Sequence, residues 1–164
     1  MRSLTASELL DAWERGLSEP TAKRALTLLE AACPDVSPDG VATLSIGERD
    51  GRLLMLREWT FGPHLVSVAN CSDCGERLEW TVNAEDLRVA RPALPPDDLS
   101  LEVDLYRVQF RLPNMLDLAA VSGCEDTSVA RVLLFGRCLS AMYRGEEEIT
   151  VADLPAEVAD AVVK

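Results

Sequence analysis

The residues of this chain with the clearest chemical potential are Cys71 and Cys74, which lie in the sequence NCSDCG at positions 70–75. Their two-residue spacing lets both sulfur atoms face one point, and Gly75 permits the positive φ that brings the backbone close to a thiolate. The flanking segments 65–69 and 77–82 have the apolar alternation of half-buried strands. The sequence therefore predicts a β-hairpin with the cysteine pair at its tip, which is the form of a zinc knuckle and half of a tetrahedral site.

The cysteine pair needs further ligands, because structural zinc takes four. Cys124 lies in a predicted loop, and His64, the only histidine, precedes the first predicted strand, so both are candidate ligands. Two hairpins of a homodimer would also supply four cysteines. Cys33 and Cys138 lie in apolar surroundings, and we expect them to be buried as small hydrophobic side chains.

A redox role is the alternative for the cysteine pair. A redox CxxC usually opens a helix, whose N-terminal dipole lowers the pKa of the first thiol. Here a strand is predicted to follow, which favours zinc. Five cysteines, an odd number, follow an N-terminal segment that has charged residues throughout and no apolar export signal. This predicts reduced thiols and a cytoplasmic protein.

The other residues that could do chemistry do not form an enzyme site. The sequence has no glycine-rich phosphate loop, no paired-histidine zinc motif and no strand–turn–helix serine. His64 has no nucleophile to act on, and Glu146 to Glu148 read as a solvated acidic face. We therefore expect no enzymatic activity, no catalytic residues and no cofactor other than zinc.

Composition limits which classes of protein and partner remain possible. The chain has 164 residues, of which 48% are hydrophobic and 5% aromatic, and its formal net charge is −12. These values predict one globular domain, 1–164, with a core of Leu, Val and Ala. Nucleic acid is not an expected partner, because Lys and Arg do not cluster. No apolar run approaches about 18 residues, so no membrane span is expected.

Capping residues and apolar patterns predict the elements that position the cysteines. Thr5 and Glu8 form a capping box that opens a helical hairpin over 5–33. Another helix follows over 45–61, before the CxxC hairpin region 63–88. The whole indicates an α+β fold with a helical N-terminal part, a small antiparallel sheet containing the zinc-knuckle-like CxxC hairpin, and a helical C-terminal part.

The region 99–164 is predicted to mix strands and helices, after a stiff proline-rich connector over 90–98. Alternation over 99–105 and 106–112 indicates two strands. Asn114 or Asp117 is expected to cap a short helix ending near 121, and longer and shorter helices are expected over 128–142 and 155–162.

The large aromatic residues have two interpretations. We expect Trp13, Trp59 and Phe61 to be buried, because large apolar side chains on or beside helices usually pack inward. The alternative is that Trp59 and Phe61, together with Trp80, anchor an interface with another protein.

The order of several motifs carries a family resemblance. They are LSIGERDGRLLMLREWTFG at 44–62, CxxCGExLEW at 71–80 with Asp86-Leu87 after it, VxFRLPxxxDL at 108–118, and LLxxRC at 133–138. In this order they resemble the baseplate hub assembly chaperone family of T-even-type contractile phage tails, which also occurs in phage-tail-like contractile injection systems. The resemblance covers roughly residues 20–160.

The resemblance implies a non-enzymatic assembly factor or minor baseplate component that binds tail or baseplate proteins. The alternative is a stand-alone zinc-knuckle interaction adaptor, unrelated to tails. The family pattern often continues beyond 154–158 into a second CxxC hairpin, which would complete a four-cysteine zinc site. This sequence contains no second pair.

Overall fold

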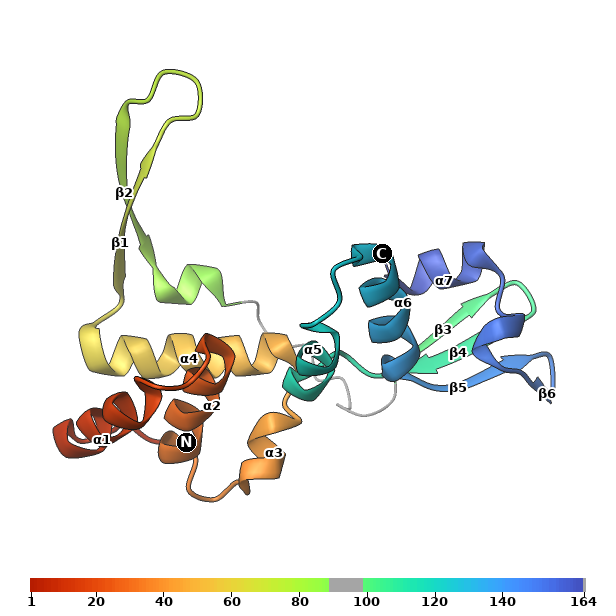
Figure 1. The fold of residues 1–164 in the computed structure, drawn as a ribbon, viewed down its shortest axis with the longest axis horizontal. Helices are drawn as coiled ribbons and strands as arrows, with labels where there is room; N and C mark the ends of the chain where they lie inside the picture. The colour runs from red at the N-terminus through yellow and green to blue at the C-terminus, as the bar shows by residue number, and fades with distance from the viewer. Residues whose placement is uncertain (89–98, 164) are drawn as a thin grey trace. The chain divides into compact units, whose positions relative to one another are not determined.

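The computed structural model describes residues 1–88 and 99–163. Contacts group the chain into two compact units, Met1–Arg91 and Pro92–Lys164. The expectation of a single domain stays a prediction. Both units mix helices with antiparallel strands (Figure 1), which confirms the α+β class. The predicted connector at 90–98 lies outside the described residues.

The first unit consists of helices followed by one long hairpin. In chain order its elements are α1 (Ala6–Gly16), α2 (Thr21–Ala32), α3 (Pro38–Ala42), α4 (Ile46–Phe61), β1 (His64–Asn70), β2 (Arg77–Asn83) and the 3-10 helix η1 (Ala84–Leu87). Helices α1 and α2 pack against each other, so the helical hairpin predicted over 5–33 is confirmed.

Helix α1 begins where its local sequence predicts. The backbone amide of Glu8 donates to the Thr5 hydroxyl at 3.3 Å, and the Thr5 amide donates to the Glu8 carboxylate at 2.9 Å. This reciprocal capping box satisfies two amides that a helix start leaves without partners. Two small residues, Ala12 and Gly16, are buried on α1, which lets α2 approach closely.

The base of the hairpin is fastened to α4. The Arg57 side chain donates to the carbonyl oxygen of Gly62 and, at 2.6 Å, to that of His64, the first residue of β1. Beyond β2, Arg88 forms an ion pair with Glu58 of α4 at 2.9 Å. These contacts hold both ends of the hairpin on one helix, while its distal part extends away from the helices (Figure 1).

The second unit packs helices on a four-stranded sheet. Its elements are β3 (Leu99–Val103), β4 (Tyr106–Phe110), α5 (Met115–Val121), α6 (Thr127–Cys138), β5 (Leu139–Arg144), β6 (Glu147–Glu148), the 3-10 helix η2 (Val151–Asp153) and α7 (Ala156–Val163). The antiparallel strand order is β3-β4-β5-β6. Val108, Met142 and Val158 form the core, so the sheet and α7 share one apolar layer.

The helix predicted over 128–142 is too long at its C-terminal end. Helix α6 ends at Cys138, and Leu139–Arg144 forms strand β5, which pairs with β4. The sequence prediction extended the helix because helical and strand preferences differ little over such a short apolar run. Pairing with β4, which is distant in sequence, decides the conformation. Cys138 and Cys33 are buried, as predicted.

No helix among the described residues is both long enough and apolar enough to cross a membrane.

Candidate functional site

The cysteine pair occupies the tip of the β1–β2 hairpin. The strands pair in register from His64 with Asn83 to Asn70 with Arg77, and the chain reverses at 71–76. Within the turn, the Cys71 amide donates to the Glu76 carbonyl at 2.8 Å, and the Gly75 amide donates to the Cys71 carbonyl at 3.0 Å. Gly75 has a φ of +73°, which glycine adopts at little cost.

The turn also directs hydrogen-bond donors at one sulfur. The backbone amides of Cys74 and Asp73, and then the Cys74 side chain, hydrogen-bond the Cys71 thiol and lower its pKa. Such bonds favour the thiolate, which is the form that binds metals and reacts as a nucleophile. The turn therefore brings the two cysteine side chains together and prepares Cys71 for a negative charge.

The other two candidate ligands belong to other parts of the fold than the hairpin tip. His64 begins β1, and seven residues of extended chain separate it from Cys71 by about 23 Å at 3.3 Å per residue. The first unit therefore places His64 at the opposite end of the hairpin from the cysteines. Cys124 lies in the second unit, between α5 and α6. Among the described residues, His, Cys, Asp and Glu nowhere gather in a group of three or more that could hold a metal.

One face of the hairpin carries apolar side chains next to the tip. Directly paired residues project to the same face, so Ala69 with Leu78 and Ser67 with Trp80 share it. Leu78 is 48% exposed and Trp80 46% exposed. A lone two-stranded hairpin with such a face is marginally stable in water, so this face is suited to packing against another protein surface.

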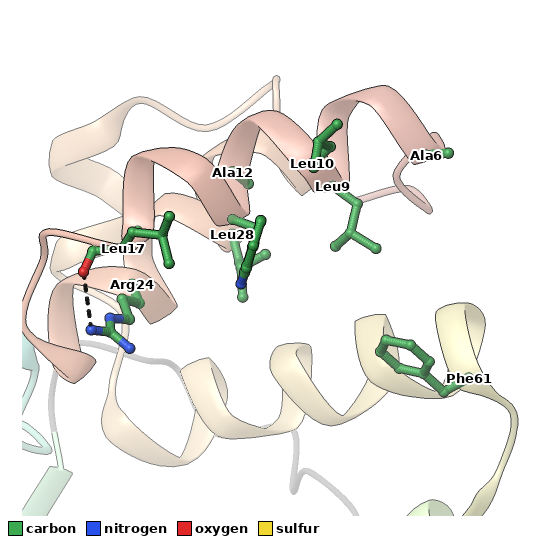
Figure 2. A pocket seen from close by; sticks show the side chains of 10 residues that line it. Ala6, Leu9, Leu10, Ala12, Leu17, Arg24, Leu28 and Phe61 are labelled. Atoms are coloured by element: carbon green, nitrogen blue, oxygen red, sulfur yellow. Dashed lines mark hydrogen bonds between the residues drawn. The ribbon is translucent and has the colours of Figure 1, made fainter.

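A second apolar surface lies among the helices of the first unit. A groove of about 520 Å³ opens between α1, α2 and the C-terminal end of α4. In Figure 2, the Leu9 side chain of α1 and the Phe61 ring of α4 point into the space between their helices. The apolar residues that line the groove include Leu9, Leu10, Trp13, Leu17, Leu28 and Phe61.

The expectation that Trp13, Trp59 and Phe61 are buried is wrong. Their side chains are 61%, 46% and 71% exposed. For Trp13, the reason is that α1 buries its small residues Ala12 and Gly16, so the neighbouring large residue is left uncovered. The apolar arc of α1 is wider than one partner helix can cover, and this width was the sequence signal for an exposed surface.

A buried ion network lies in the second unit. The Asp117 carboxylate has no exposed surface, and Arg111 donates to its two oxygens at 2.5 and 2.9 Å. Arg137 Nε and the Asn114 amide each donate to the carboxylate at 3.0 Å. Arg111, through its hydrogen bonds, is the leading cause that lowers the pKa of Asp117 to about 2.

This network explains the motifs at 108–118 and 133–138 structurally. Arg111 follows β4, Asp117 lies in α5 and Arg137 lies in the last turn of α6. One carboxylate thus joins three consecutive elements. Asn114 and Asp117 both take part in the cap of α5, because Asn114 accepts from the amides of Leu116 and Asp117. Because these donors occupy both carboxylate oxygens, Asp117 has a structural role.

Comparison with known proteins supplies the family. The model of the T4 bacteriophage base plate protein family matches residues 6–164, nearly the whole chain. Comparisons with curated proteins and with solved structures gave no match. The family match agrees with the baseplate part of the resemblance described above. The chain therefore belongs to the T4 bacteriophage base plate protein family and is a phage baseplate protein.

Proposed function

We propose that this protein is a non-enzymatic assembly factor or minor baseplate component of a contractile phage-tail-like particle, and that it acts by binding other tail or baseplate proteins. The observation that carries the proposal is the apolar groove of the first unit. Trp13, Leu17 and Phe61 line it and are largely exposed. Exposed apolar clusters of this kind mark protein-binding surfaces, and tryptophan is enriched among residues that dominate binding energy.

The charge of the chain supports a protein partner with a basic surface. A net charge of −12 gives a long-range attraction that speeds encounter with a positively charged partner. It also keeps a protein with an exposed groove soluble before assembly. The groove fits a helix that presents apolar side chains three and four residues apart.

The experiment deletes the gene for this protein in the system that produces the particle and supplies variants of the protein to restore assembly. Trp13→Gln with Leu17→Gln should fail to restore baseplate assembly, judged by electron microscopy of particles. Val132→Gln with Leu133→Gln is the matched control, because these α6 side chains are also exposed and apolar but lie in the other unit. Full rescue by the groove variant, at normal protein levels, would contradict the proposal.

The same particles separate the two forms of the proposal. Mass spectrometry of purified, complete particles should detect the chain if it is a minor component. An assembly chaperone would be required for baseplates to form yet would be missing from the finished particle.

The sequence also suggested a zinc-knuckle adaptor unrelated to tails. Family membership supports a baseplate role instead, and the cysteine hairpin is then a second binding element of a baseplate protein. The tight turn at its tip, which holds Cys71 and Cys74 in one reversal of the chain, supports a metal-binding role for this element.

A further inference from the structure

We propose that the outer edge of strand β1 binds an extended segment of another tail or baseplate protein, which pairs with it as a third strand of the hairpin sheet. This sheet has two strands, so each of them has one edge that no other strand of the sheet covers. An uncovered edge presents backbone amides and carbonyl oxygens that can pair with another chain. That the partner belongs to the tail or baseplate rests on the proposed function, whereas the open edge does not.

The register of the hairpin shows which backbone groups point outward. Near the tip, the Cys71 amide donates to the Glu76 carbonyl at 2.8 Å. At the base, the Ala84 amide donates to the Pro63 carbonyl at 2.8 Å. The strands pair residue by residue between these two bonds. Because bonded and non-bonded pairs alternate in an antiparallel ladder, the odd-numbered residues of β1 bond to β2, and the even-numbered residues direct their amides and carbonyl oxygens to the outer edge.

The outward-facing residues of β1 are His64, Val66, Val68 and Asn70. The carbonyl oxygen of His64 accepts from the Arg57 side chain at 2.6 Å, which agrees with its outward direction. Within residues 1–88 and 99–163, the outward amides and carbonyl oxygens of Val66 and Val68 have no hydrogen-bond partner. The two valine side chains are also 73% and 50% exposed. This stretch of β1 therefore offers both free backbone groups and apolar side chains.

The outer edge of β2 differs from that of β1 because it carries charge. Arg77 and Glu79 are outward-facing residues of β2, and their side chains form an ion pair at 2.7 Å. Charged side chains on an edge strand oppose pairing with another strand. Strand β1, with the sequence HLVSVAN, contains no Lys, Arg, Asp or Glu. Of the two edges, β1 is the one that is open to a partner.

The chemistry of this edge selects an extended segment. The outward groups repeat at every second residue, about 6.8 Å apart at 3.4 Å per residue, and another strand has the same repeat. A helix cannot pair with them, because its own backbone groups are bonded within the helix. Val66 and Val68 project to one face, so the partner strand should carry apolar side chains at alternate positions. A net charge of −12 repels a second copy of this chain, which favours a different protein as the source of the strand.

Site-specific photo-crosslinking in cells that assemble the particle tests the pairing. A benzophenone amino acid replaces Val66 in one variant and Val68 in another, and mass spectrometry identifies the residues to which each becomes linked. Side chains on one face of a strand repeat every second residue. Both positions should therefore crosslink to one segment of one partner, at sites two residues apart. The same amino acid at Val132, an exposed position of α6, is the control and should not crosslink to that segment.

Charge variants test whether the edge of β1, rather than a face of the hairpin, makes the contact. Val66→Lys should reduce recovery of the crosslinked partner with the protein by at least about tenfold, because a lysine on an edge strand opposes pairing. Thr81→Lys is the matched control and should keep the partner. Thr81 pairs directly with Val66, so this variant places the same charge on the same face but on the other strand. Val66→Thr keeps a β-branched side chain and should also keep the partner.

Four outcomes would overturn the inference. Crosslinked sites three or four residues apart would mean that the partner binds as a helix. Crosslinks to another copy of this chain would assign the edge to self-association. Absence of crosslinks from both valine positions would show that the edge stays open. Equal loss of the partner in Val66→Lys and Thr81→Lys, with unchanged circular dichroism spectra, would assign binding to the face of the hairpin.

Failure at this edge can be told apart from failure of the proposed function. The groove variants change α1 and leave β1 intact, whereas the crosslinking variants change β1 and leave the groove intact. Full rescue by the groove variant would contradict the proposed function without removing the crosslinks from β1.

Discussion

At the residue scale, the strongest single interaction site is the Asp117 network. A buried carboxylate is costly unless charged and polar donors surround it, and here two arginine side chains and a backbone amide do so. Removing one partner of such a network leaves uncompensated groups, which costs more than the net worth of the intact interaction.

Asp117→Asn should therefore lower the free energy of unfolding by about 2–3 kcal/mol, less than the full cost of a buried pair because the arginine side chains are partly exposed. Urea unfolding followed by circular dichroism measures the change. Asp160→Asn is the control. Its ion pair with Arg131, at 3.4 Å, joins two exposed side chains and should contribute under about 0.5 kcal/mol. Equal effects of the two substitutions would contradict the assigned role.

The lowered pKa of Asp117 predicts that the stability of the fold depends on pH. The folded-state pKa of Asp117 is about 2, below the usual value near 3.9 for an unfolded chain. A depressed pKa contributes stability above the unfolded value, here roughly 2 kcal/mol, and this contribution is lost as the pH falls from about 4 to 2. The stability difference between wild type and Asp117→Asn should shrink over that range. A difference that stays constant with pH would show that the charge of Asp117 is not what stabilises the fold.

At the element scale, local sequence decides where elements begin and turn. Thr5 and Ser45 cap their helices, and Gly75 allows the tight turn of the hairpin. These effects act within a few residues, so they can be read from sequence. The fate of 139–144 cannot, because it depends on pairing with β4.

Two glycine substitutions should have opposite signs. Gly75→Ala places a side chain at a φ of +73° and should cost about 1–2 kcal/mol of hairpin stability. Gly51→Ala lies within α4 with nothing near the new Cβ, and should stabilise the protein by up to about 1 kcal/mol. Thermal unfolding shows whether Gly51→Ala stabilises the protein. Amide hydrogen exchange at 65–82 measures the change in hairpin stability that Gly75→Ala causes. Stabilisation by both substitutions would mean that the turn at Gly75 is not strained by a side chain.

At the scale of the whole molecule, contacts concentrate within the two units. The second unit has its own apolar core around Val108 and its own ion network. The first unit has buried residues of its own, among them Leu29, Val41 and Leu56, and it also exposes large side chains in a groove and on a hairpin. Each unit therefore has buried apolar residues of its own, and the proposed binding groove lies in the first unit.

The fragment 92–164 should consequently fold by itself and unfold cooperatively, since its core and network are internal to it. Circular dichroism during urea unfolding tests this. Asp117→Asn should destabilise the fragment by the same amount as the full chain. A fragment without a cooperative transition would show that the second unit depends on the first.

The sequence by itself determined the α+β class, the helical hairpin, the α4 helix, the cysteine hairpin and the burial of Cys33 and Cys138. Its motif order also pointed to the baseplate family. Caps, glycine turns and strand alternation are properties of neighbouring residues, so a single chain displays them.

Only the tertiary structure decided which apolar residues are covered. Trp13 and Phe61 are large apolar residues of the kind that usually form a core, yet they are exposed. Whether such a residue is buried depends on whether another element packs against it. Tertiary structure likewise joined Arg111, Asp117 and Arg137, which are up to 26 residues apart in sequence. Spacing along a chain determines what one element presents, whereas distances between elements exist only after folding.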